Sequence, residues 1–181
     1  QCFAPNIPQM HVVNHLTGEV AEGETRQVLV EAARLARGQI KDIAEAKAEN
    51  FDALIVPGGF GVAKNLSDFA IKGVEMSVNP QVLSLARSFK SAAKPVGLIC
   101  ISPTLAAAIF GEGVQCTIGQ DADTAAAIET MGGKHVASQV DEIVVDEANK
   151  LVTTSAYMMA GRIREAAAGI NKRVDKVLAL A

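Results

Sequence analysis

Short apolar runs alternate with amphipathic stretches along the whole chain. Three of these runs, residues 52–56, 96–100 and 143–145, are predicted to be strands. The first two show little alternation of apolar and polar positions, which indicates strands covered on both faces of a sheet. Because helical stretches separate the strands, the pattern predicts an α/β fold with a mostly parallel sheet.

Signals for helix ends mark two of the expected helices. Thr25 stands where it could cap a helix that Gly38 would stop. Asn79 before Pro80 places a favourable N-cap ahead of a proline in the first helical turn, so a helix is expected to begin there.

The C-terminal region predicts a hairpin followed by a long helix. Residues 143–145 and 151–154 flank a polar loop, so they are expected to form a small antiparallel addition to the sheet. The helix has an apolar stripe at Ile163, Ala166, Ala167, Ile170, Val174, Val177 and Leu178. Its basic residues are expected to form a solvated face: Arg162, Arg164, Lys172, Arg173 and Lys176.

Composition limits the function classes. The chain has 181 residues, 49% of them hydrophobic, with a net charge of −3, which predicts one globular domain spanning residues 1–181. A pI near 5.6 and few aromatic residues argue against a nucleic-acid partner. No apolar stretch reaches the ~20 residues of a membrane span, so no membrane partner is expected.

The cysteines argue against a disulfide framework and a structural zinc site. Cys2, Cys100 and Cys116 form an odd set without a CxxC spacing, which favours a reducing compartment. The sequence opens at Gln1 without an initiator Met, so a targeting segment could precede it.

The most informative segment for chemistry is the end of the strand at residues 96–100. Cys100 closes this strand, Ser102 is placed to cap the next helix, and Pro103 fits its first turn. Such a tight turn lifts its apical side chain into the crevice at the carboxyl end of a parallel sheet, as in a nucleophile elbow. The helix N-terminus would favour the thiolate. The alternative is that Cys100 is a small buried apolar residue.

A glycine-rich loop follows the strand at residues 52–56. Gly58 and Gly59 lack the spacing of a phosphate-binding loop or a dinucleotide fingerprint. An oxyanion hole made by the N–H groups of Gly59 and Ile101 fits better, with a plain turn as the alternative. Lys64 and Asn65 could add polar groups to the same rim or lie on the solvated surface.

Three histidines are the only imidazole bases. His11 and His15 would share a metal only in a helix, and Val12-Val13 between them favours a strand, so no metal is expected. His15 could reach the crevice or make a structural hydrogen bond. His135 is predicted to begin a strand away from the site.

Several motifs resemble one family across essentially the whole chain. They are residues 13–18 (VNHLTG), 24–29 (ETRQVL), 57–67 (PGGFGVAKNLS), 97–103 (GLICISP) and 152–158 (VTTSAYM). In this order they resemble the ElbB group, the enhancing-lycopene-biosynthesis proteins of the ThiJ/PfpI and class I glutamine amidotransferase-like superfamily.

The resemblance implies a flavodoxin-like three-layer sandwich with an elbow cysteine that matches Cys100. It also implies oxyanion donors that match the backbone of Gly59 and Ile101, and a homodimer. It further implies that the protein is located in the cytoplasm of a bacterium or, in a eukaryote, in the mitochondrion.

Two departures from the superfamily matter. Many members have a histidine directly after the cysteine, where this chain has Ile101, which argues against a Cys-His protease or amidotransferase mechanism. The superfamily also supplies a glutamate beside the cysteine from a first βα unit of roughly 30 residues. That unit precedes the segment that residues 1–5 resemble, so we expect the domain to be N-terminally incomplete.

Two functions from different classes follow. The first, which the resemblance to the ElbB group implies, is a cofactor-independent glyoxalase of the lyase type, which converts glyoxal or a similar small dicarbonyl to a 2-hydroxy acid through Cys100. The second is a non-catalytic binding or regulatory protein that keeps the pocket, linked to isoprenoid metabolism by resemblance only.

Overall fold

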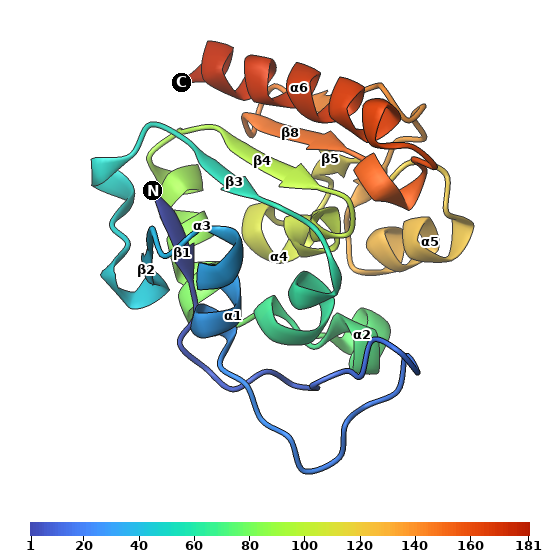
Figure 1. Cartoon of the computed structure of the whole chain (residues 1–181). Helices are drawn as coiled ribbons and strands as arrows, with labels where there is room; N and C mark the ends of the chain where they lie inside the picture. Colours follow the sequence, from blue (N-terminus) through green and yellow to red (C-terminus); the bar gives the residue numbers. More distant parts are fainter.

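A four-stranded sheet forms the centre of the computed structural model, which describes residues 1–181 (Figure 1). Its strand order is β3-β4-β8-β7, where β3 is Leu54–Val56, β4 is Val96–Ile99, β8 is Leu151–Thr154 and β7 is Val144–Asp146. The strands β3, β4 and β8 are parallel, and β7 is antiparallel to β8. The expected parallel sheet and C-terminal hairpin are therefore both confirmed.

Two further parallel pairs extend the fold. β1 (Cys2–Ala4) pairs with β2 (Ile40–Asp42), and β5 (Gln115–Cys116) pairs with β6 (Lys134–His135). His135 therefore lies in a strand, as expected.

Helices and helical turns connect the strands. The α-helices are α1 (Val28–Leu35), α2 (Phe69–Lys72), α3 (Pro80–Ser91), α4 (Ala106–Phe110), α5 (Ala122–Thr130) and α6 (Ile163–Leu180). The 3₁₀ turns are η1 (Ile43–Glu45), η2 (Ala48–Asn50), η4 (Gly73–Glu75), η5 (Ser102–Leu105) and η6 (Ala156–Met158), and η3 (Val62–Leu66) is a short π-helix. None of the helices combines the length and apolar composition that a membrane crossing requires.

The central sheet lies between two helical layers. α6 packs on β8 and β4, while α3 also contacts β4 and packs beside α4 (Figure 1). The main apolar core includes Val96 and Leu98 of β4, Phe89 of α3 and Ile109 of α4. This layered α/β arrangement confirms the fold class predicted from the alternation of strands and helices.

The two apolar strands differ in how they are covered. All four residues of β4 are buried, as predicted. The same prediction is wrong for β3, because Ile55 is 39% exposed. The reason is position: β4 lies inside the sheet, whereas β3 lies at the end of its strand order, beyond the strands on which α6 packs.

One of the two predicted helix starts is confirmed, and the other is wrong. Asn79 caps α3 as predicted, since its Oδ1 accepts hydrogen bonds from the N–H groups of Gln81 and Val82 at 3.0 and 3.2 Å. The prediction for Thr25 is wrong, because α1 begins at Val28 with extended Gln27 at the N-cap. A bridge from Pro8 to Gln27 holds this segment extended ahead of the helix.

The faces of α6 also differ from the prediction. Ile163 and Leu178 of the expected apolar stripe are exposed, whereas Arg173 of the expected solvated face is buried with 1% of its surface exposed. The buried face of the helix includes Ala166, Gly169 and Val177. Arg173 is buried because it lies on this face, four residues after Gly169 and four before Val177.

Candidate active site

Cys100 stands at a sharp bend directly after β4. Its φ is +62°, a left-handed backbone conformation that few non-glycine residues adopt. The N–H of Cys100 donates a 2.9 Å hydrogen bond to the carbonyl of Thr154, which continues the pairing of β4 with β8 for one more residue. The chain then enters η5 and α4, and the Cys100 side chain is half-buried. The elbow predicted from the sequence is therefore present.

Gly58 packs directly against this bend. A β-carbon on Gly58 would overlap Cβ of Cys100 and would lie 2.9 Å from the Ile99 carbonyl oxygen and 3.0 Å from Sγ of Cys100. Only a residue without a side chain fits so close to another backbone. The loop after β3 and the bend after β4 are thus in contact, as expected for neighbouring parallel strands.

Ser102 ties these two segments together. It is fully buried, and its Oγ accepts a 2.7 Å hydrogen bond from the Ile99 N–H. The same hydroxyl lies 3.0 Å from the carbonyl oxygen of Val56, at the end of β3, and 2.8 Å from that of Ile99.

The prediction that Ser102 caps the following helix is wrong, because its side chain faces back to β3 and β4. Sequence reasoning missed this role. The only available signal was a serine placed between an apolar strand and a proline. Pro103 does lie in the first turn of η5, as predicted.

The two expected oxyanion donors belong to the two segments that meet at the bend, Gly59 to the loop after β3 and Ile101 to the bend itself. Gly59 has a φ of +92°, a conformation that suits glycine, and Ile101 directly follows Cys100. Neither N–H donates a hydrogen bond within the chain. Backbone N–H groups of this kind can stabilise a developing alkoxide when they point at it.

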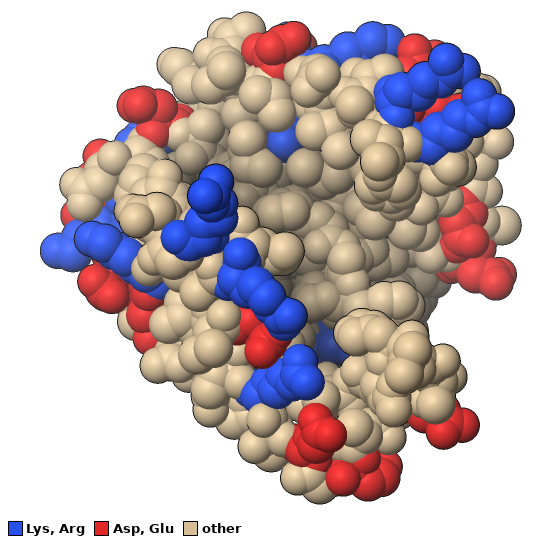
Figure 2. Space-filling model, in the orientation of Figure 1, with Lys and Arg blue, Asp and Glu red and all other residues tan.

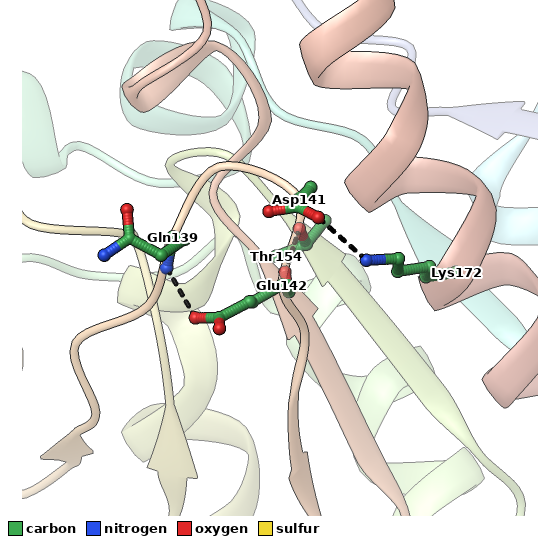
Figure 3. Close-up of polar contacts among 5 residues, drawn as sticks. All are labelled: Gln139, Asp141, Glu142, Thr154 and Lys172. Atoms are coloured by element: carbon green, nitrogen blue, oxygen red, sulfur yellow. Dashed lines mark hydrogen bonds and ion pairs between the residues drawn. The ribbon is translucent and has the colours of Figure 1, made fainter.

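Thr154 is held by a hydrogen bond to the segment that precedes β7. Its hydroxyl donates a 2.8 Å hydrogen bond to the Glu142 carbonyl (Figure 3). The Glu142 carboxylate accepts a 2.7 Å hydrogen bond from the Gln139 N–H, and Lys172 of α6 forms a 2.9 Å ion pair with Asp141. These contacts fix the strand end whose carbonyl receives the Cys100 N–H.

Asn65 and Lys64, which were considered for the rim or for the solvated surface, make the following contacts. Asn65 in η3 accepts a 2.9 Å hydrogen bond from the Met10 N–H, which attaches the long N-terminal loop. The Lys64 ammonium lies 5.3 Å from the centre of the Phe60 ring, a cation–π distance.

His15 lies in an exposed turn, and its imidazole makes no hydrogen bond, so the structural hydrogen bond considered for it is absent. The strand expected around Val12-Val13 is reduced to a single bridge between Val13 and Val20.

Burial shifts the pKa of two other groups, Cys116 and His135. Burial raises the pKa of the Cys116 thiol to about 12, so this thiol stays protonated. Burial also lowers the pKa of His135, whose Nε2 lies 3.4 Å from the Ile118 N–H. No group of three or more His, Cys, Asp or Glu side chains is arranged to hold a metal ion.

Comparison with known proteins identifies the family. The family model of the DJ-1/PfpI family matches residues 21–162. The chain is 47% identical over 189 residues to the human "glutamine amidotransferase-like class 1 domain-containing protein 3, mitochondrial", covering 99% of this chain and 70% of the relative.

Solved structures agree with this assignment. An isoprenoid biosynthesis protein with an amidotransferase-like domain from Ehrlichia chaffeensis is 37% identical, with a TM-score of 0.90, over 99% of this chain and 82% of that one. Glyoxalase III from Candida albicans, at 15% identity and a TM-score of 0.53 over 84% and 68% of the two chains, shares the fold alone. With its flavodoxin-like architecture and its elbow cysteine, the chain belongs to the DJ-1/PfpI family.

Proposed function

We propose that the protein is a cofactor-independent glyoxalase-like enzyme that converts glyoxal or a similar small dicarbonyl to a 2-hydroxy acid. The observation that carries this proposal is the half-buried Cys100 at φ +62°, beside two N–H groups without partners in the chain. A thiol at such a bend can approach a carbonyl carbon while the backbone receives the charge that develops on its oxygen.

The reaction is balanced without an external oxidant. The Cys100 thiolate adds to one aldehyde carbon of glyoxal, and the N–H groups of Gly59 and Ile101 stabilise the alkoxide. Protonation of this oxygen gives a hemithioacetal. A proton then moves from that carbon to the neighbouring carbon through an enediol, so the first carbon is oxidised and the second reduced. Water cleaves the resulting thioester, which releases glycolate and the thiol.

The proton transfer between the two carbons requires a base. His15 is exposed and His135 lies in β6, so we do not assign the base to either. The family resemblance assigns it to a glutamate in the first βα unit. Cys100, Gly59 and Ile101 of this chain therefore carry the addition and the charge stabilisation, and the proton shuttle is assigned to none of its residues.

The test is glycolate formation from glyoxal by the purified protein and two matched variants. Cys100→Ser should lose turnover, because a serine hydroxyl is a far weaker nucleophile at neutral pH. Cys2→Ser should keep it, because Cys2 is exposed at the start of β1. Equal turnover by wild type and Cys100→Ser would rule out the mechanism.

The second candidate is a non-catalytic binding protein. Ile101 favours it, because many members of the superfamily have a histidine at this position after the cysteine. Iodoacetamide labelling of Cys100 across pH separates the two. The pH midpoint of the labelling rate gives the apparent pKa of Cys100. A value well below the ~8.5 pKa of a free cysteine supports the enzyme. A labelling rate with the pH dependence of a free cysteine, together with no glycolate formation, supports the binding protein.

The homodimer and the mitochondrial or cytoplasmic location remain proposals that follow from the family. The human relative is mitochondrial by name.

A further inference from the structure

Two left-handed bends lie at neighbouring strand ends, and one backbone hydrogen bond joins these ends. Cys100 has a φ of +62° directly after β4, and Ala156 has a φ of +42° two residues after the end of β8. The Cys100 N–H donates its 2.9 Å hydrogen bond to the carbonyl of Thr154, the last residue of β8. Such strained conformations persist only where the surrounding structure holds them. The contacts that fix Thr154 therefore also help to fix the backbone of Cys100.

The Thr154 side chain is fixed from two sides. It is fully buried, and its hydroxyl donates a 2.8 Å hydrogen bond to the Glu142 carbonyl (Figure 3). On the side of α6, a β-carbon on Gly169 would lie only 2.7 Å from Oγ1 of Thr154. The hydroxyl of the next residue, Ser155, is buried and makes no hydrogen bond. Thr154 is therefore the last residue at this end of β8 whose side chain is held by a hydrogen bond.

The preceding residue, Thr153, provides a matched comparison. It is also fully buried, and its hydroxyl accepts a 2.9 Å hydrogen bond from the Thr117 N–H. Because successive residues of a strand point to opposite faces of a sheet, the Thr153 side chain lies on the face away from α6. The two threonines are thus alike in burial and in hydrogen bonding, but only Thr154 carries the carbonyl that binds the Cys100 N–H.

We propose that Thr154 is a positioning residue for Cys100, and that its hydroxyl, acting through the end of β8, sets the reactivity of the thiol. This inference rests on the proposed function, in which Cys100 is the nucleophile. A methyl group in place of the hydroxyl needs about 3.3–3.6 Å to a carbonyl oxygen, more than the 2.8 Å of the hydrogen bond to Glu142. Because the backbone of α6 at Gly169 leaves no room on the other side, the end of β8 must move, and the Thr154 carbonyl moves with it.

The link to reactivity is the direction of the Cys100 side chain. The thiolate is the reactive form of a cysteine, and nearby N–H groups and helix dipoles stabilise it. The peptide group between Ile99 and Cys100 helps to set the direction of this side chain, and Thr154 holds the N–H of that peptide group. Displacement of the Thr154 carbonyl therefore moves the sulfur away from the surroundings that favour its thiolate.

The experiment measures the rate at which iodoacetamide labels Cys100 across pH. This reagent is uncharged, so its rate is not governed by the Lys and Arg side chains that gather on parts of the surface (Figure 2). All proteins carry Cys2→Ser, because Cys2 is exposed and would react as well. Thr154→Val should label about fivefold more slowly at neutral pH, and Thr154→Ser, which keeps the hydroxyl, should restore the rate to within about twofold. Thr153→Val should also stay within about twofold, because its side chain lies on the opposite face.

Unfolding free energies of the same variants check that both valine variants lose stability, so that slower labelling is not ascribed to destabilisation alone. If Thr154→Val labels as fast as Thr153→Val, Thr154 has a structural role only and the proposal is wrong. Slow labelling of Thr154→Ser would also overturn it, because the hydroxyl would then not be the group that matters. If Thr154→Val does not fold, Thr154→Ala takes its place with the same expectation. Labelling needs no glyoxal, so absence of glycolate formation rejects the glyoxalase, whereas the labelling comparison alone decides the role of Thr154.

Discussion

Gly58 and Cys100 are in such close contact that a methyl group on Gly58 would overlap Cβ of Cys100 and approach its Sγ to 3.0 Å. The two residues lie more than 40 positions apart in the chain, but the parallel pairing of β3 and β4 brings their strand ends together. The position of the proposed nucleophile, Cys100, therefore depends on Gly58, a residue without a reactive side chain.

Substitution of Gly58 tests this dependence. Gly58→Ala should displace the Cys100 bend, lower stability by about 1–3 kcal/mol and reduce both glyoxal turnover and iodoacetamide labelling of Cys100. Gly61→Ala is the matched control, because a β-carbon there meets no atom within 4 Å and the backbone at Gly61 is helical. Thermal unfolding and labelling rates measure both effects. Equal behaviour of the two variants would contradict the contact.

The backbone at Cys100 predicts an unusual order of stabilities. Glycine normally destabilises a chain relative to alanine, but at φ +62° the order should reverse. Cys100→Gly should therefore be more stable than Cys100→Ala by about 1 kcal/mol, since the left-handed conformation costs roughly that amount for a residue with a β-carbon. Both variants should lack turnover. Denaturant unfolding gives the comparison, and a more stable alanine variant would show that the bend is not strained.

Ser102 should contribute to stability through its buried hydroxyl. In Ser102→Ala the Ile99 N–H loses its 2.7 Å acceptor, and leaving a buried donor unsatisfied costs about 1–3 kcal/mol. Ser88→Ala serves for comparison, because Ser88 is an exposed serine whose hydroxyl bonds only to the preceding helical turn, at the Ser84 carbonyl. Unfolding free energies should separate the two variants. A loss below about 0.5 kcal/mol for Ser102→Ala would mean that the hydroxyl is dispensable.

Asp146 predicts a pH-dependent contribution. Burial by itself would raise the pKa of Asp146, but the hydrogen bonds donated by the Gln115 N–H and by Asn149 outweigh it, so the net shift is downward from 3.8. Because the folded pKa lies below the unfolded one, the stabilisation is present above pH ~4 and disappears as pH falls through the folded pKa.

The comparison for this prediction is Asp146→Asn. The variant should be less stable than wild type at pH 7, and the difference should shrink as the pH drops below about 4. Unfolding curves between pH 2 and 7 measure it. A difference that stays constant over this range would show that Asp146 acts through packing and not through its charge.

Local signals in the sequence predicted the elements well. The apolar runs located β3, β4 and β8, and Asn79 with Pro80 located the start of α3. The abrupt change from strand to proline after Cys100 also revealed the elbow. These features depend on residues close together in the chain, so their patterns are visible without a structure.

Contacts between distant segments were not predictable in this way. The direction in which the Ser102 hydroxyl points and the exposure of Ile55 both depend on which strands are neighbours and where the covering helix stops. The burial of Arg173 is the clearest example, since a basic residue on an amphipathic helix is normally exposed to solvent. The glycine at position 97 of β4 leaves the space that its guanidinium occupies.

The sequence by itself determined the alternation of strands and helices, the bend at Cys100 and the glycines that permit it, because each follows from local backbone preferences. Only the tertiary structure decided that Gly58 fits against Cys100, that Ser102 joins two strand ends and that Arg173 lies buried on β4. The physical reason is that these contacts arise from the packing of surfaces whose residues are far apart in the chain.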